Sequence, residues 1–385
     1  LSWSDKWAGT KPTGGIAFQW ATDDSKLSTA QKALLGVETT ATGATVATRG
    51  ENVLNFIRGD RSLEAAAPTT PPTAANPNKP FRTRTSRQGD IVNSEIWYTG
   101  SPISRSTLSG YSTFISTYKN REPMLYVGGN DGMLHGFSAK DGKEKLAYVP
   151  RGVIADLKKL ADPDYEHRYY VDGSPMTGDV QDSSAWKTML VGTLGAGGKG
   201  YFVLDVTNPA GFASASASTL ITLDRTRGNS EADPVCASLT GTEKTACTAA
   251  VPENADIGNI VAQPVRNPSD LQETTQITRL NNGRWAVVLG NGYNSANQRA
   301  VLLVQYLDGD KELKRIQTTA QTTGVGNAKD NGLAAPALVD LDGDGKADVA
   351  YAGDNLGNLW KFDLTSDDDS IWAVAFGNNT PLFTA

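Results

Sequence analysis

The stretch Met124-Leu-Tyr-Val-Gly-Gly-Asn-Asp-Gly-Met-Leu-His-Gly-Phe-Ser138 carries the pattern that predicts the fold of this chain. An apolar run reaches a glycine, a short turn follows, and a second apolar run leads away from the turn. The turn contains Asn130-Asp131-Gly132, residue types that tolerate the positive φ angles of a tight hairpin. The stretch therefore predicts a β-hairpin, and a single hairpin cannot bury both of its faces.

The same pattern recurs three more times, at Met189 to Asp205, at Trp285 to Val304 and at Val349 to Asp363. One marker glycine identifies each of the four copies, and these glycines lie 64, 98 and 63 residues apart: Gly128, Gly192, Gly290 and Gly353. A unit of about 60 residues, with one copy enlarged by an insertion, indicates a repeat architecture.

Further strand candidates lie between the copies, at Lys145–Val149 and Ala335–Asp340. Four antiparallel strands per unit, repeated radially, form a β-propeller. A β-sandwich also uses short strands, but the internal period favours blades. We therefore predict a mainly β fold, a propeller of four-stranded antiparallel blades over residues 82–385. Whether the last blade is complete at the C-terminal end is left open.

The composition of the 385 residues excludes several classes of function. The chain has 36 basic and 42 acidic residues, a net charge of −6 and a pI near 5.1, which disfavours nucleic acid and anionic membranes as partners. No window approaches the roughly 18 apolar residues of a membrane-spanning helix, so we expect no direct membrane insertion. Two histidines and two scattered cysteines are too few for a zinc finger or ribbon. The 39 glycines and 18 prolines indicate many tight turns.

Residues 1–81 have a different texture and predict an N-terminal extension. Ser28-Thr29-Ala30-Gln31 reads as a capping box that opens a short helix at Ala30–Leu35, and a second helix is predicted at Glu51–Arg58. Such short helices are unstable alone in water, so we expect them to pack on the propeller. The proline-rich stretch Ala65–Pro80 predicts a linker or a long loop.

One segment has the spacing of a metal-binding loop. The sequence Asp340-Leu-Asp342-Gly-Asp344-Gly-Lys346-Ala-Asp348 places carboxylates at positions 1, 3, 5 and 9 and glycine at position 6. Calcium takes about 6–8 oxygen ligands, and such a loop folds around it with position 7 offering a backbone carbonyl. We predict Ca²⁺ bound by the side chains of Asp340, Asp342, Asp344 and Asp348 and by the carbonyl of Lys346.

The alternative for this segment is a solvated acidic turn. Four carboxylates within nine residues repel one another, and a turn that needs only polarity would not accumulate them. Calcium is favoured over magnesium because a flexible loop with many oxygens suits the larger ion. Position 12, where a helical calcium loop has a bidentate glutamate, is Tyr351, and the flanking segments are strand candidates. The site is therefore predicted in a β-hairpin.

Cys236 and Cys247 lie in the polar stretch Glu231–Thr248, which we expect to be a surface loop. A disulfide between them is favoured over two free thiols, because free cysteines prefer apolar neighbours. A disulfide would place folding in an oxidising compartment.

Arg58-Gly59-Asp60 is an integrin-type recognition tripeptide, but three specified residues recur by chance, and Gly59 already serves as a helix stop. A structural role is therefore favoured there. His135 and His167 are interpreted as packed side chains, since no nucleophile motif accompanies them. No catalytic group is assigned, and we expect the protein not to be an enzyme.

Several ordered segments together resemble the C-terminal β-propeller domain of the PilY/PilC family, the large tip-located adhesins and assembly factors of type IV pili. The resemblance covers most of residues 82–385 and also Asn55–Asp60. It rests on Asn130–Phe137, Tyr170–Pro175, Trp186–Gly192, Gly195–Thr207, Gly290–Ser295 and Tyr351–Leu364.

The resemblance implies a modified propeller of seven blades and a secreted protein at the cell surface and pilus tip, passing the periplasm or outer membrane during assembly. It implies pilin and minor pilin subunits as partners, with a host-cell or surface receptor as a further candidate. The implied roles are pilus extension against retraction, twitching motility and surface attachment. The family's calcium site falls on Asp340, Asp342, Asp344, Lys346 and Asp348, where occupancy would shift the protein between states that permit and oppose retraction.

Two alternatives remain open from the sequence. A propeller-type quinoprotein oxidoreductase also combines blades with calcium, although such enzymes often carry adjacent cysteines, and Cys236 and Cys247 are not adjacent. The other alternative is a binding module in which calcium only stabilises one blade.

Overall fold

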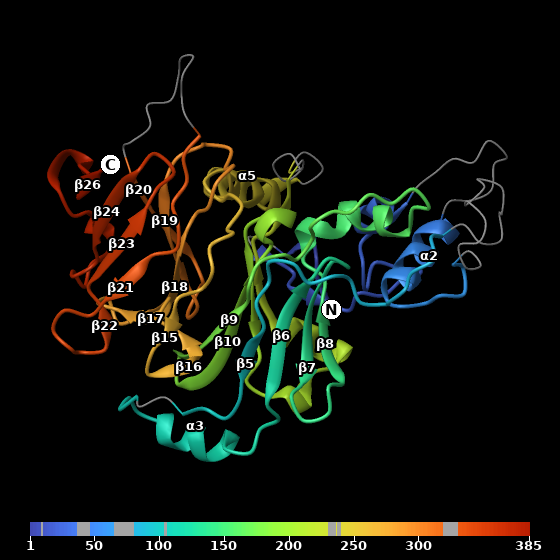
Figure 1. Ribbon diagram of the computed structural model, residues 1–385, viewed down its shortest axis with the longest axis horizontal. Helices are drawn as coiled ribbons and strands as arrows, with labels where there is room; N and C mark the ends of the chain where they lie inside the picture. The colour runs from blue at the N-terminus through green and yellow to red at the C-terminus, as the bar shows by residue number, and fades with distance from the viewer. Residues whose placement is uncertain are drawn as a thin grey trace.

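The computed structural model describes residues 1–8, 11–36, 47–64, 81–103, 106–229, 236, 240–318 and 330–385. The predicted linker Ala65–Pro80 lies outside these residues. Within them, four larger sheets stand side by side in chain order, and the N-terminal segment lies beyond the first sheet (Figure 1). The described part of the chain is thus mainly β, as the repeat pattern predicted.

Antiparallel strands form the first two sheets, and within each sheet a strand pairs with the next strand of that sheet along the chain. The first sheet consists of β5 (Trp97–Thr99), β6 (Met124–Gly129), β7 (Met133–Ser138) and β8 (Glu144–Tyr148). The second consists of β9 (Met176–Asp182), β10 (Ala185–Thr193), β12 (Tyr201–Asp205) and β13 (Ile221–Asp224).

The third and fourth sheets repeat this order and each add a short strand. The third consists of β17 (Ile277–Leu280), β18 (Trp285–Gly290), β19 (Val301–Tyr306), β20 (Leu313–Gln317) and the added β22 (Lys346–Ala347). The fourth consists of β21 (Ala337–Val339), β23 (Val349–Gly353), β24 (Asn358–Asp363), β25 (Ala373–Val374) and the added β26 (Phe383–Thr384). Both predicted strands, at Lys145–Val149 and Ala335–Asp340, are therefore present within a residue or two.

Each marker glycine lies at or near the end of the second strand of its sheet, on β6, β10, β18 and β23. Close approach explains two of them. A Cβ atom on Gly128 would lie 2.3 Å from the carbonyl oxygen of Val171, and one on Gly290 would lie 1.9 Å from that of Ala334. In both cases the incoming chain of the next sheet runs where a side chain would be.

Three apolar clusters fill the spaces between neighbouring sheets. Successive side chains of a strand point to opposite faces, so Val287 on β18 packs toward the second sheet while Val288 packs toward the fourth. Between the first and second sheets, the rings of Tyr148 and Phe202 lie 4.9 Å apart. Each inner sheet is thus covered on both faces.

The N-terminal residues pack on the first two sheets. Short strands β1 (Ser2–Trp3) and β4 (Gly15–Ile16) pair with each other, and so do β2 (Trp7–Ala8) and β3 (Lys11–Pro12). Helix α1 (Thr29–Leu35) begins with the predicted capping box, in which Ser28 and Gln31 exchange hydrogen bonds. Helix α2 (Ala47–Ile57) begins four residues before the predicted start. The domain boundary at residue 82 stays a prediction.

The other helices of four or more residues and the other short strands lie between strands of one sheet or between successive sheets. They are α3 (Tyr111–Tyr118), α4 (Ala217–Leu220), α5 (Gly241–Ala255), the 3-10 helix Arg151–Ala161, and the short strands β11 (Gly198–Lys199), β14 (Arg227–Gly228), β15 (Arg266–Asn267) and β16 (Asp270–Thr274). No helix among the described residues is long and apolar enough to cross a membrane. The insertion that enlarges the repeat between Gly192 and Gly290 holds α4, α5 and the hairpin β15–β16.

Candidate metal site

The acidic segment forms the loop between β21 and β23. Two glycines allow the chain to turn sharply there, since Gly343 has a φ of +81° and Gly345 a φ of +83°. The carboxylate of Asp340 accepts hydrogen bonds from both glycine N–H groups, at 2.7 and 2.8 Å. The loop thus folds around its own first carboxylate, at one end of the fourth sheet.

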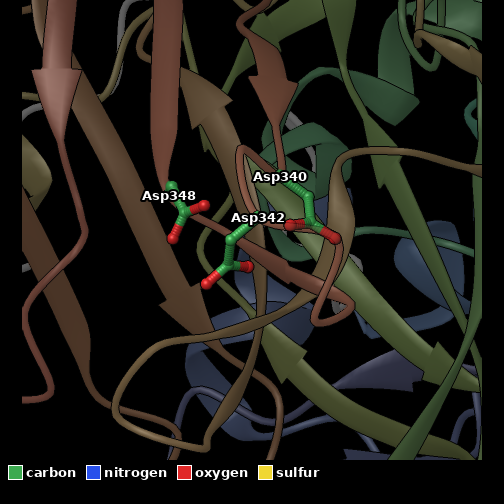
Figure 2. Close-up of side chains that lie close together, drawn as sticks. All are labelled: Asp340, Asp342 and Asp348. Atoms are coloured by element: carbon green, nitrogen blue, oxygen red, sulfur yellow. The ribbon is translucent and has the colours of Figure 1, made fainter.

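Three of the four predicted carboxylates come together. Asp340, Asp342 and Asp348 each offer an oxygen within 4.8 Å of the other two, and Figure 2 shows the three side chains gathered at the loop. Asp340 and Asp342 are exposed, whereas Asp348 is only 6% exposed. Three converging carboxylates repel one another, and a bound hard cation would relieve that repulsion while supplying the oxygen coordination that Ca²⁺ and Mg²⁺ prefer. This cluster could hold a metal ion.

The fourth predicted carboxylate has another partner. Asp344 pairs with the ammonium group of Lys346, and the hydrogen bond from Lys346 lowers the pKa of this exposed carboxyl. The backbone of Lys346 lies in β22, opposite Arg279 of the third sheet. The roles of Asp344 and of the Lys346 carbonyl as ligands therefore stay predictions.

The buried carboxylate of the group is held from two sides. One oxygen of Asp348 accepts the N–H of Leu341 at 2.7 Å, within the loop. The other accepts the side-chain amide of Asn281 at 2.9 Å, from the turn between β17 and β18. The sequence reasoning missed Asn281, because it lies 67 residues before Asp348 and belongs to no ligand motif.

Cys236 and Cys247 are joined by a disulfide in the structure. Their surroundings differ from the predicted surface loop, because Cys247 belongs to helix α5 and both cysteines are at least 90% buried. The polar composition of this stretch gave no sign of helix α5. Glu243 lies in its first turn, where a negative charge is stabilised by the positive end of the helix dipole.

The Arg58-Gly59-Asp60 tripeptide follows helix α2. Gly59 has a φ of +102°, as expected for the residue that stops the helix. The Asp60 carboxylate accepts the N–H of Ser62 at 2.8 Å, and this contact lowers its pKa. Asp60 therefore stabilises a local turn, which supports the structural interpretation of the tripeptide.

The two histidines are engaged by carboxylates. His135 is buried and bonds Glu144 at 2.6 Å and Asp131 at 3.0 Å. Burial alone would lower the pKa of His135, but these two hydrogen bonds raise it to about 9. His167 bonds Asp90 at 2.8 Å on the surface. His135 therefore stays protonated at neutral pH and would be a poor general base.

Known proteins are similar to this chain in sequence and in fold. Residues 88–255 and 270–381 match the family model of the PilY1 beta-propeller domain. The chain is 37% identical over 366 residues to the type IV pilus biogenesis factor PilY1 of Pseudomonas aeruginosa strain PAK, covering 88% of this chain and 26% of that protein. It is 35% identical over 353 residues to a PilY1 homolog of Xylella fastidiosa strain Temecula1, covering 86% of this chain and 21% of that protein.

A solved structure agrees with these matches. The crystal structure of the Pseudomonas aeruginosa PilY1 C-terminal domain superposes with a TM-score of 0.53 at 34% identity, over 75% of this chain and 52% of that chain. The chain spans about a quarter of the length of the curated relatives. With most of its residues matched by the family model, the chain belongs to the PilY1 β-propeller domain family.

Proposed function

We propose that this chain is the calcium-binding propeller region of a type IV pilus biogenesis factor and tip-associated adhesin. The observation that carries the proposal is the match to relatives named as type IV pilus biogenesis factors, over 88% of this chain. Those names describe a role in assembly rather than a catalysed reaction, in keeping with the predicted absence of enzymatic activity. In this role the protein supports pilus extension against retraction, twitching motility and surface attachment.

The calcium part of the proposal is supported by the loop geometry. The carboxylates of Asp340, Asp342 and Asp348 converge, and two turn glycines shape the loop around Asp340. Asp344 and the Lys346 carbonyl would complete the ligand set once Asp344 gives up its pairing with the Lys346 ammonium group. A hard divalent cation would then bind oxygen donors only, which favours calcium over softer metals.

Calorimetric titration of the purified chain with calcium, and separately with magnesium, tests this part. Asp342→Ala should lower calcium affinity at least tenfold, because it removes a convergent charged ligand. Asp344→Ala is the matched variant, and we expect a smaller loss because Asp344 must first leave Lys346. If the wild-type chain takes up no calcium, or if Asp342→Ala binds as tightly as wild type, the metal assignment is wrong.

The proposed setting is the cell surface and the pilus tip, reached by secretion through the periplasm or outer membrane. The Cys236–Cys247 disulfide supports an oxidising compartment. The proposed partners are pilin and minor pilin subunits, together with a surface or host-cell receptor.

A genetic test separates regulatory from purely structural calcium. The Asp342→Ala substitution is placed in the intact gene, and piliation, twitching and attachment are compared with those of the Asp344→Ala strain. A regulatory role predicts altered piliation or twitching while the protein remains present at the surface. Normal piliation and motility, with only a lowered melting temperature of the purified variant, would leave calcium with a structural role alone.

A further inference from the structure

The acidic loop belongs to two sheets at once. Its first carboxylate follows β21 of the fourth sheet, but its later part, β22, pairs in parallel with β17 of the third sheet. Arg279 lies opposite Lys346 and Leu280 lies opposite Ala347. The loop that gathers the three carboxylates is therefore also the added edge strand of the preceding sheet.

Asn281 follows β17 directly and extends this connection by its side chain. Its Nδ2 atom lies 2.9 Å from Oδ1 of Asp348, 3.0 Å from the carbonyl oxygen of Leu364 and 3.3 Å from that of Ala347. Two of these acceptors belong to the acidic loop, and the third, on Leu364, directly follows β24 of the fourth sheet. One side chain, from the turn after β17, thus connects the third sheet to the acidic loop and to the end of β24.

Asp348 has a distinct place among the three carboxylates. It is the buried member of the group, and its two oxygens accept one hydrogen bond from the loop and one from Asn281. A donor that fixes the orientation of a ligating side chain lowers the cost of ordering it when the ion binds. Asn281 is placed to act on the ion in this way without touching it.

We propose that Asn281 is a positioning residue that couples ion binding at the Asp340–Asp348 loop to the docking of the third sheet on the fourth. The inference rests on the proposed metal site. The Asn281 amide orients Asp348, so the contact between β17 and β22 favours ion binding. Because linkage is reciprocal, the bound ion must in turn strengthen that contact. Ion binding at an exposed loop would then change the stability of the contact between two blades.

The neighbouring residue in the same turn provides a matched control. The Nδ2 atom of Asn282 donates to the hydroxyl of Tyr306 at 2.7 Å, and that hydroxyl donates in turn to Asp369. The contacts of Asn282 and Tyr306 with Asp369 join the third sheet to the segment between β24 and β25, but they do not reach the acidic loop. Asn282→Ala should therefore lower stability without a specific effect on ion affinity.

The test compares wild type, Asn281→Ala and Asn282→Ala in the full 385-residue chain, using calcium as the ion. Calorimetry should show calcium affinity about tenfold weaker in Asn281→Ala and unchanged in Asn282→Ala. Hydrogen exchange should show that calcium slows the amides of both β22 and β17 in wild type. In Asn281→Ala, calcium should still protect the loop but no longer protect β17.

The outcomes separate the two proposals. Calcium binding by wild type, with equal affinity and equal β17 protection in Asn281→Ala, overturns the coupling and leaves the metal site intact. Absence of calcium binding by wild type overturns the metal site, and the coupling with it. Should Asn281→Ala fail to fold, Asn281→Ser replaces it in the same comparison. The serine hydroxyl lies one bond nearer to the backbone than the amide nitrogen of Asn281, so it should not reach Asp348 as the amide does.

Discussion

The third and fourth sheets share one plan but differ in what covers them. Both have the same strand order, and both carry a marker glycine at the end of the second strand, Gly290 or Gly353. In the third sheet every residue of β19 is buried, because apolar clusters lie on both faces. In the fourth sheet, Trp360 on β24 is buried while its neighbour Leu359 is 37% exposed.

The difference shows that the repeat pattern specifies strands and turns, whereas neighbours decide how much each blade contributes to stability. Residues at the same place in the pattern therefore contribute differently to the free energy of unfolding in the two sheets. Paired substitutions can measure these contributions directly.

The largest contrast is expected on the two faces of β24. Trp360→Ala should lower the free energy of unfolding by about 3–5 kcal/mol, because it empties a core position and removes the hydrogen bond from the indole N–H to Asp354. Leu359→Ala should cost less than about 1 kcal/mol, since its side chain remains partly in water. Urea denaturation measures both, and equal losses would contradict the one-sided burial of this sheet.

An intermediate contrast is expected at the marker glycines. Gly290→Ala should cost about 1–3 kcal/mol, because the new Cβ would lie 1.9 Å from a backbone oxygen and the next sheet's entry chain must shift. Around Gly353 a Cβ would meet nothing closer than 3.9 Å, so Gly353→Ala in this chain should change stability by less than about 0.5 kcal/mol. A costly Gly353→Ala would show that the two positions are more alike than their surroundings suggest.

The smallest contrast concerns the loss of stability at low pH. The carboxylate of Asp256, the residue after α5, forms ion pairs with Arg299, just before β19, at 2.7 Å and with Arg315, on β20, at 2.5 Å. Burial alone would raise the pKa of Asp256, but the hydrogen bonds from Arg299 and Asn297 hold it below its ordinary value of 3.8. A carboxyl with a lowered pKa stabilises the fold above that ordinary value, and the stabilisation is lost as the pH falls through the folded-state pKa.

Denaturation at pH 7, 4 and 3 in a metal chelator checks the effect. The loss of stability toward pH 3 should be reduced in Asp256→Asn, which has no carboxyl to protonate. It should persist in Asp344→Asn, because Asp344 is an exposed loop residue whose ion pair with Lys346 is screened by solvent and contributes little to stability. An unchanged acid response in Asp256→Asn would assign the acid sensitivity to other carboxyls.

Local patterns in the sequence predicted much of this molecule. The four hairpins, the capping box at Ser28 and the pairing of Cys236 with Cys247 each depend on residues close together in the chain. Three of the acidic residues converge as the loop spacing predicts. The pairing of Asp344 with Lys346 competes with the predicted role of Asp344, and spacing alone cannot rank the two.

What the sequence could not show depends on distant contacts. Asn281 reaches Asp348 across 67 residues, and its Asn-Asn-Gly turn is indistinguishable from an ordinary hairpin turn until the sheets are placed side by side. Helix α5 was missed because its polar composition suits a surface loop equally well, and that composition gives no sign that Cys247 is buried.

The parallel pairing of β22 with β17 also constrains the order in which the chain can fold. The third sheet cannot gain its last strand until the segment after Gly345, belonging to the next hairpin, has been synthesised and has turned back. Contacts between distant segments form late, since a long loop must close before they provide any stabilisation. The third blade is therefore completed only after the fourth has begun to form, and until then its β17 edge is open to pairing with other strands.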